Sequence, residues 1–238
     1  AFWGCAVMFI LALSSVPKFV HNSSKIQSSE VVSILQGGRM LVSNRQFVLI
    51  LLGALGGGIA MAFANSYFFS YMKELGADTA TSGLALTIST IAEVPVLFFG
   101  NQLIKKFNPF YIYVFGLFLT GFRLVLFGLA FTAQQALFIQ LLGGLTFPLM
   151  LVSSVALIAD YAPPGLNATA QGIFSAVYFG IGIGLGGFLG GILMDHIGAK
   201  GMASVFSVIT LLVVVIIFLI SKRVDLNSRK IARKFYLG

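Results

Sequence analysis

The sequence contains very few charged residues. Only 9% of its 238 residues are Asp, Glu, Lys or Arg, whereas 58% are hydrophobic and the mean hydropathy is +0.99. Soluble globular proteins carry about 25% charged residues. The composition therefore excludes a soluble enzyme or a soluble binding domain, and it predicts an all-α integral membrane protein with several spans.

Cysteine and histidine are also scarce. Cys5 is the single cysteine, so it cannot form a disulfide within the chain, and His21 and His196 are isolated with no metal-ligand spacing. The sequence shows no nucleophile and base pattern of the kind that hydrolases use. We therefore expect no enzyme activity, no metal site and no cofactor.

Negative charge is the scarcer sign, and the formal net charge is +8. In a soluble protein this excess would point to nucleic acid, but here the basic residues gather in short loops and near residue 238. If residues 18–45 face the cytoplasm, twelve basic residues lie on that side and only Lys73 and Lys200 lie on the other, with Arg123 inside the membrane. The twelve are Lys18, Lys25, Arg39, Arg45, Lys105, Lys106, Lys222, Arg223, Arg229, Lys230, Arg233 and Lys234. This asymmetry predicts a multi-pass protein of the bacterial plasma membrane with a cytoplasmic C-terminus and no nucleic-acid partner.

Long hydrophobic runs recur along the chain. Six of them are long enough to span a bilayer as helices, at about 46–72, 80–100, 110–131, 135–158, 168–193 and 202–221. We expect residues 46–221 to form one six-helix bundle.

The flanking segments are assigned by composition. Residues 1–17 are predicted to be the end of an earlier transmembrane helix, and residues 18–45 a cytoplasmic loop. Within that loop, residues 31–42 have the pattern of a short amphipathic helix broken at Gly37 and Gly38. Residues 222–238 are predicted to be a basic cytoplasmic tail.

Two of the apolar segments share a weak internal repeat. One begins TATSGLALT and ends GNQLIKKFN, and the other begins NATAQGIFS and ends GGILMDHIG. Gly83 and Gly100 are 17 positions apart, and Gly172 and Gly190 are 18 apart. The two segments would cross the membrane in opposite directions, which is the pattern of a 3+3 inverted repeat in transporters.

These motifs carry a resemblance to a known family. GGILMDHIG keeps Gly191, Leu193, Asp195 and Gly198 at the spacing of a major facilitator motif, and GNQLIKKFN stands where that family often has G-x-L-x-D-R-x-G. The segment APPGLNATAQG lies between the corresponding helices. The chain therefore resembles the C-terminal half of a major facilitator superfamily transporter, and most closely the branch of lactose-permease-like and phenylpropionate-permease-like proton symporters. Lys105 departs from the acidic residue of the family motif.

The resemblance implies the architecture and the partners. The six segments would be helices seven to twelve of a twelve-helix fold, and residues 1–17 would end helix six. The expected partners are the lipid bilayer, the missing N-terminal six-helix half, a small solute and a proton.

Two charged residues lie inside the apolar segments. A charge near the bilayer centre costs about 3 kcal/mol or more, so such residues are rare and usually functional. At 1.5 Å per residue, Glu93 lies about 12 Å and Arg123 about 20 Å from the cytoplasmic edge, a difference that two side chains can bridge. We expect Glu93 to bind and release a proton and Arg123 to hold the solute. The alternative is a static ion pair that locks two helices together.

Other polar and small residues are weaker candidates. Asn65, Tyr67, Ser89 and Gln140 are predicted to line the solute site, although a tyrosine near a helix end is often an interfacial anchor and a serine often bonds back to its own helix. Similar symporters often carry a titratable group on helix ten, where this chain has Gln140.

Residues near the helix ends and the glycine-rich segment have predicted structural roles. Lys105, Lys106 and Asp195 are candidates for gating or latch contacts, although orientation alone explains the lysines. The glycines of segment 168–193 predict close helix packing, at Gly180, Gly184, Gly186, Gly187, Gly190 and Gly191.

Together these features predict a secondary active transporter that moves a small polar or anionic solute by alternating access with a proton. The alternative is an accessory or assembly subunit with the same fold and no transport activity. A non-transporting subunit would purify in a stable complex and have no cavity that reaches Glu93.

The topology is tested with reporters. A green fluorescent protein fused after residue 238 of the full-length protein should fluoresce, and alkaline phosphatase at the same place should be inactive, because that end is predicted to be cytoplasmic. Fusions after Lys200 should give the opposite pair of results. Active alkaline phosphatase after residue 238 would contradict the assignment.

Overall fold

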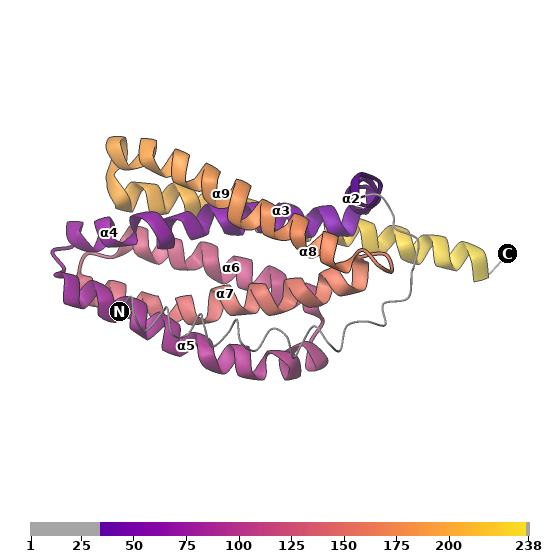
Figure 1. Cartoon of the computed structure of the whole chain (residues 1–238), viewed down its shortest axis with the longest axis horizontal. Coiled ribbons are helices and arrows are strands. Elements are labelled where there is room, and N and C mark those ends of the chain that lie inside the picture. The colour runs from indigo at the N-terminus through magenta and orange to yellow at the C-terminus, as the bar shows by residue number, and fades with distance from the viewer. Residues whose placement is uncertain (1–33, 237–238) are drawn as a thin grey trace, which may run out of the picture. The chain divides into compact units, whose positions relative to one another are not determined.

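The computed structural model of the protein describes residues 34–236, with side chains from residue 38 to residue 222, and it is helical with short connections over that range. The chain divides into two units at residues 1–36 and 37–238, and the second unit is described here (Figure 1). The predicted helix end at 1–17 and most of the predicted loop lie outside the described residues. Helix α2 (Ile34–Ser43) continues through Gly37 and Gly38, so the predicted break there is wrong.

Four of the long helices begin at a residue whose side chain caps the helix N-terminus. The oxygen of an Asn, Asp or Thr accepts from a backbone N–H of the first turn, which no helix carbonyl can pair. The capped helices are α3 (Arg45–Ala62), α5 (Thr79–Lys106), α6 (Pro109–Leu129) and α7 (Ala133–Tyr161), with caps Asn44, Asp78, Asn108 and Thr132. Hydrogen bonds from the Thr81 side chain and from the Thr81 N–H, the latter at 2.8 Å, lower the pKa of the Asp78 carboxyl below its usual value.

Two helical segments contain π-helical turns, which the sequence did not predict. One segment runs through α3, η1 (Phe63–Tyr67) and α4 (Phe68–Glu74), and the other through α8 (Asn167–Ser175), η2 (Ala176–Gly182) and α9 (Ile183–Tyr236). A π-helical turn closes its hydrogen bond over one more residue than an α-helical turn, and such turns are frequent at functional sites.

Five described helices are long and apolar enough to cross a membrane. The last, Asn167–Lys222, is 56 residues long, or about 84 Å at 1.5 Å per residue, which is more than twice the thickness of the hydrocarbon core. Its two arms meet at Gly198, where the backbone is non-helical with φ 69°. This left-handed conformation suits glycine. All six predicted apolar segments therefore correspond to helical arms, and the chain is a multi-pass membrane protein.

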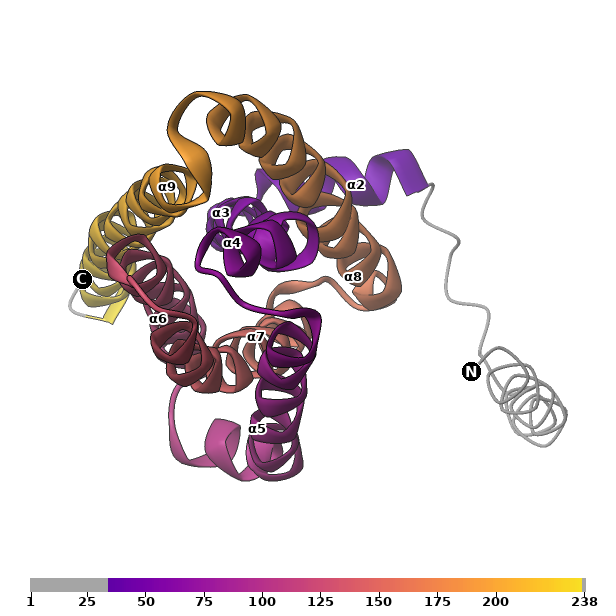
Figure 2. The same ribbon diagram turned by 90° about the vertical axis from the view of Figure 1, so that its left-hand side faces the viewer.

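Helix α3 lies at the centre of the described bundle. Figure 2 shows α3 and α4 surrounded by α6, α7, α8 and α9, with α5 on the far side of α7. Helix α3 packs mainly on η2 and α9, α5 packs on α7, and α6 packs on both α7 and α9. Two buried tyrosines fix these contacts through backbone carbonyls, since Tyr71 donates to Phe127 O and Tyr113 donates to Ile50 O, both at 2.7 Å.

Missing side chains allow α3 to approach the glycine-rich segment closely. A Cβ at Gly182 would lie 2.9 Å from the Gly58 Cα, and one at Gly186 would lie 2.7 Å from the Ile59 carbonyl oxygen. Gly190 is packed in the same way against Tyr67. Only small residues permit this backbone contact.

The remaining predicted packing glycines behave differently. A Cβ at Gly180, Gly184 or Gly187 would meet no atom within 4 Å in the described part of the chain, and one at Gly191 would make ordinary contact with Tyr67. The packing stripe inside the bundle therefore consists of Gly186 and Gly190 from the predicted set and of Gly182, which was not predicted, because the other glycines do not face α3.

A pair of glycine substitutions tests this assignment. Gly186→Ala should lower stability by about 1–3 kcal/mol, because its methyl group collides with α3 backbone. Gly184→Ala is the matched control in the same helix, and it should leave stability unchanged or raise it by up to about 1 kcal/mol through helix propensity. Melting temperatures of the purified proteins in detergent distinguish the two. Equal effects of both substitutions would show that the stripe is assigned to the wrong face.

Candidate functional site

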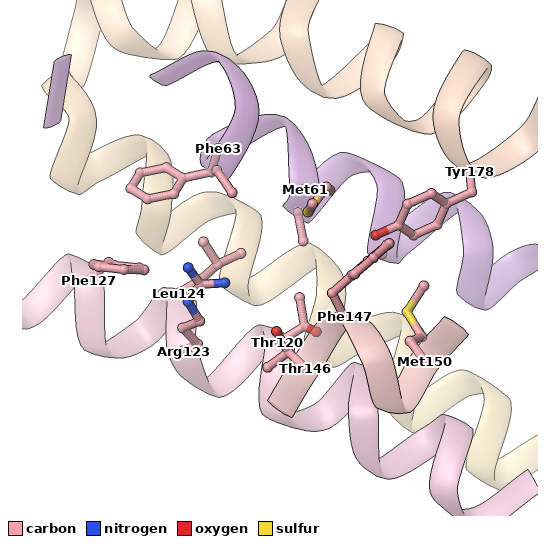
Figure 3. A pocket seen from close by; sticks show the side chains of 13 residues that line it. Met61, Phe63, Thr120, Arg123, Leu124, Phe127, Thr146, Phe147, Met150 and Tyr178 are labelled. Atoms are coloured by element: carbon pink, nitrogen blue, oxygen red, sulfur yellow. The ribbon is translucent and has the colours of Figure 1, made fainter. Parts of the chain in front are cut away.

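A small cavity inside the bundle contains the Arg123 guanidinium. The cavity has a volume of about 20 Å³ and is formed by α3, η1, α6, α7 and η2, which is enough for one water molecule. Its walls are mostly apolar, with Phe63 and Phe127 at one end and Tyr178 at the other (Figure 3). Thr120 and Thr146 add two hydroxyl groups.

Not all hydrogen-bond donors of the Arg123 side chain have an acceptor in the described part of the chain. Its Nη2 donates to Oε1 of Gln140, which is 1% exposed, and its guanidinium carbon lies 5.2 Å from the centre of the Phe127 ring, a cation–π contact. The buried Nε finds no hydrogen-bond partner in the described part of the chain. A buried guanidinium donor that lacks an acceptor is costly, so the site is prepared for an additional acceptor, whether water, a carboxylate or a solute oxygen.

Glycine at position 143 brings Arg123 toward α5. A Cβ on Gly143 would lie 2.6 Å from the Ser89 Oγ and 2.9 Å from the Arg123 Cζ, so both groups occupy the space of the missing side chain. Next to it, Gly144 lies against the backbone of Ala92. Glu93 follows Ser89 by one helical turn, about 6 Å along the axis.

Glu93 is half-buried on α5 and does not line the cavity. The cavity of the described residues therefore does not reach Glu93, which is what the accessory-subunit alternative predicts. Arg123 lies beside Ser89 at Gly143, and Ser89 is one helical turn from Glu93. The partner of the guanidinium among the described residues is nevertheless Gln140 and not Glu93. In the described part of the chain Arg123 therefore bonds to an uncharged side chain, and the roles predicted for Glu93 and Arg123 stay predictions.

The other predicted site residues are spread more widely. Asn65 is exposed on η1, and the Tyr67 hydroxyl donates to the Gly187 carbonyl, so neither lines this cavity. Lys105 and Lys106 are exposed at the end of α5, and Asp195 is exposed near the end of the first arm of α9.

Several residues that line the cavity were not predicted from the sequence. Thr120 and Phe127 follow the spacing of one face of α6 that also carries Arg123, at i, i+3 and i+7, so this face was predictable once Arg123 was chosen. Tyr178 lies in a segment that was interpreted only as a glycine packing surface. Among the described residues, no group of three or more His, Cys, Asp or Glu side chains is placed to hold a metal ion.

The Arg123–Gln140 bond is tested by removing its acceptor. Gln140→Leu should lower stability by about 1.5–3 kcal/mol, since a hydrogen bond to a buried charged group is lost. Gln140→Glu keeps an acceptor and should remain stable, and Gln134→Leu, exposed on the same helix, should have little effect. Melting temperatures in detergent give the comparison, and a Gln140→Leu protein as stable as the parent would contradict the assigned bond.

Comparison with known proteins agrees with this architecture. The model of the MFS_1 like family matches residues 1–208. The chain is 25% identical over 217 residues to the major facilitator superfamily domain-containing protein 6-like protein A of Xenopus laevis, covering 89% of this chain and 34% of that protein. It is 24% identical over 214 residues to the uncharacterized transporter YwbF of Bacillus subtilis, covering 88% and 51%. It is also 25% identical over 192 residues to the maltose permease of Geobacillus stearothermophilus, covering 79% and 48%.

A solved structure gives the same fold. The nucleoside transporter NupG superposes with a TM-score of 0.68 at 17% identity, covering 82% of this chain and 54% of that one. The chain spans about a third to a half of the length of the three curated relatives named above. Because the family model matches most of its residues, the chain belongs to the MFS_1 like family.

Proposed function

We propose that this chain is the C-terminal half of a secondary active transporter, which moves a small polar or anionic solute by alternating access and couples it to a proton. The observation that carries the proposal is the Arg123 guanidinium, which lines a cavity inside an apolar bundle and has a buried donor without a partner. A group that is costly to keep in a membrane protein is typical of a solute or ion pathway.

Arg123 is the solute-binding residue in this proposal. Its planar guanidinium has five donors, of which Gln140 uses one. The remaining donors suit a carboxylate, phosphate or hydroxyl-rich solute, which an arginine holds in a bidentate manner. The apolar walls around it would orient the solute and exclude water, as is usual for small-molecule sites.

Glu93 is the proposed proton-coupling residue. When Arg123 bonds to Gln140, it is not paired with the Glu93 carboxylate, whose ionised form is then less well stabilised. When Arg123 moves past Gly143 to pair with Glu93, its charge favours the ionised carboxylate. A solute that draws Arg123 to one side therefore changes the proton affinity of Glu93, and this linkage is reciprocal.

The reciprocal packing of the helices supports an inverted repeat of three and three helices. Helix α5 packs on α7, and in the same way η2 packs on α3. Helix α6 also packs on α7, and in the same way Val213 in the second arm of α9 packs against Gly56 of α3. Helix α5 leaves most of its apolar surface uncovered by the described residues, which agrees with a position between lipid and a second six-helix half. Residues 46–221 would then be helices seven to twelve, with the C-terminus in the cytoplasm.

The relatives define the solutes to be tried first. NupG is a nucleoside transporter and the Geobacillus protein is a maltose permease, so a panel of uridine, maltose and a small carboxylate such as acetate covers nucleoside, sugar and anion. Uptake is measured in proteoliposomes that contain the full-length protein.

Glu93→Gln is the decisive substitution for coupling. It should lower the solute-driven proton flux at least tenfold relative to the parent protein. Exchange of solute between equal concentrations on the two sides of the membrane should continue, because only the proton acceptor is removed. A pH-sensitive dye inside the vesicles gives the measurement. Thr87→Val, an exposed change on the same helix, is the control and should leave the flux intact.

Two results would contradict the proposal. Proton flux that persists in Glu93→Gln would remove the coupling role. Absence of uptake for every panel solute, together with purification of the full-length protein in a stable complex, would favour an accessory subunit.

A further inference from the structure

The glycine-rich segment buries every fourth residue. Over 167–191, the buried positions form a single series, namely Ala170, Phe174, Tyr178, Gly182, Gly186 and Gly190. In an α-helix four residues turn through about 400°, so such a series drifts about 40° at each step and about 200° over five steps. In a regular α-helix, the residues at one end of this series would therefore face away from α3.

The π-helical turn η2 reduces this drift, because it holds more residues in each turn. Within it the Ile183 N–H donates to the carbonyl of Tyr178, five residues earlier. The internal repeat also indicates one additional residue in this segment. Gly172–Gly190 is one position longer than Gly83–Gly100, and of these two intervals only Gly172–Gly190 contains a π-helical turn.

Tyr178 sits at the closest contact between η2 and α3. Its carbonyl lies against Gly58, and the Gly182 Cα is 2.9 Å from where a Gly58 Cβ would be. Its ring stacks on Phe174 at 6.1 Å with an angle of 9° and is packed by Met150 beside Gly57. These contacts fix the side chain, which is 3% exposed.

The hydroxyl of this rigid side chain points into the cavity. Figure 3 shows it directed inward from η2, at the end opposite Phe63, Phe127 and Arg123. The buried hydroxyls of Tyr71 and Tyr113 donate to backbone carbonyls, whereas the Tyr178 hydroxyl is directed into the cavity, which in this structure has room for about one water molecule. A tyrosine hydroxyl donates or accepts one hydrogen bond, and it combines this polar tip with a large apolar body.

We propose that Tyr178 is a specificity-determining residue of the site, whose hydroxyl bonds to an acceptor atom of a ligand that Arg123 holds by a negatively charged or acceptor-rich group. The ligand class is an oxyanion-bearing organic solute with a second oxygen or nitrogen acceptor. The effect on KM that we expect rests on the proposed transport function. The accessibility of the site does not depend on that function.

Thiol labelling tests the site without knowledge of the solute. Tyr178→Cys is made in full-length protein whose other cysteines, Cys5 included, are replaced by serine. The anionic reagent sulfonatoethyl methanethiosulfonate should label it about tenfold faster than the cationic trimethylammonium reagent, after correction for their rates with a free thiol. The preference should disappear when Arg123→Gln is added, because the attracting charge is removed.

Ser153→Cys is the matched control, since Ser153 is fully buried on α7, donates to Leu149 O and does not line the cavity. It should react with neither reagent. A Tyr178→Cys protein as unreactive as this control would overturn the proposal, and so would a preference that survives Arg123→Gln.

Tyr178→Phe gives the kinetic readout. For the panel solute that the parent protein takes up, it should raise KM about tenfold with little change in kcat, as expected for one hydrogen bond to a charged or strongly accepting group. Tyr113→Phe should lower the melting temperature instead and leave KM unchanged. An unchanged KM in Tyr178→Phe would refute the specificity role. If the parent transports no panel solute, the transport proposal fails while the labelling result still decides whether Tyr178 and Arg123 share an accessible site.

Discussion

The burial of one guanidinium constrains this bundle more than any other interaction. Arg123 stays charged at any physiological pH, and an apolar bundle offers few acceptors for its donors. The surrounding residues stabilise the buried guanidinium: Gln140 supplies an acceptor, Phe127 supplies a ring face, and Gly143 leaves space for the side chain. One donor of Arg123 remains without a partner among the described residues, at the edge of a cavity whose walls are otherwise mostly apolar.

The arrangement around that cavity depends on what side chains are absent. Gly143 and Gly144 allow α5 to reach α7, while Gly58 and Gly182 allow η2 to reach α3. Both contacts bring backbone against backbone, so the helices are held by packing rather than by the hydrophobic effect, which lipid does not supply. The small cavity beside Arg123 and Tyr178 is lined by residues of α3, α6, α7 and both π-helical turns.

Much of the fold was predictable because its signals are local. The six apolar segments, the four N-terminal caps and the pair of buried charges are all visible in the sequence, and the predicted segments fall on helical arms. The break predicted at Gly37 and Gly38 was wrong, because glycine lowers helix stability without preventing a helix.

The site itself was predicted only in part. Arg123 bonds to Gln140 and lies beside Ser89 at Gly143, whereas Asn65 and Tyr67 do not line the cavity, and their common role in binding a solute stays a prediction. Tyr178 was missed because its position depends on the π-helical turn, whose register is set by contact with α3. The spacing of four among the small residues was visible, but an α-helical interpretation could not keep Tyr178 and Gly190 on one face.

The central claim is that water reaches Arg123 and Glu93 from a membrane surface. The most direct test is a cryo-EM structure of the full-length protein in lipid nanodiscs, at a resolution that shows ordered water. We expect a continuous hydrated path from one surface to the Arg123 guanidinium in at least one conformation. Structures in which both side chains are sealed from both surfaces by tightly packed neighbours, in every conformation observed, would contradict the account.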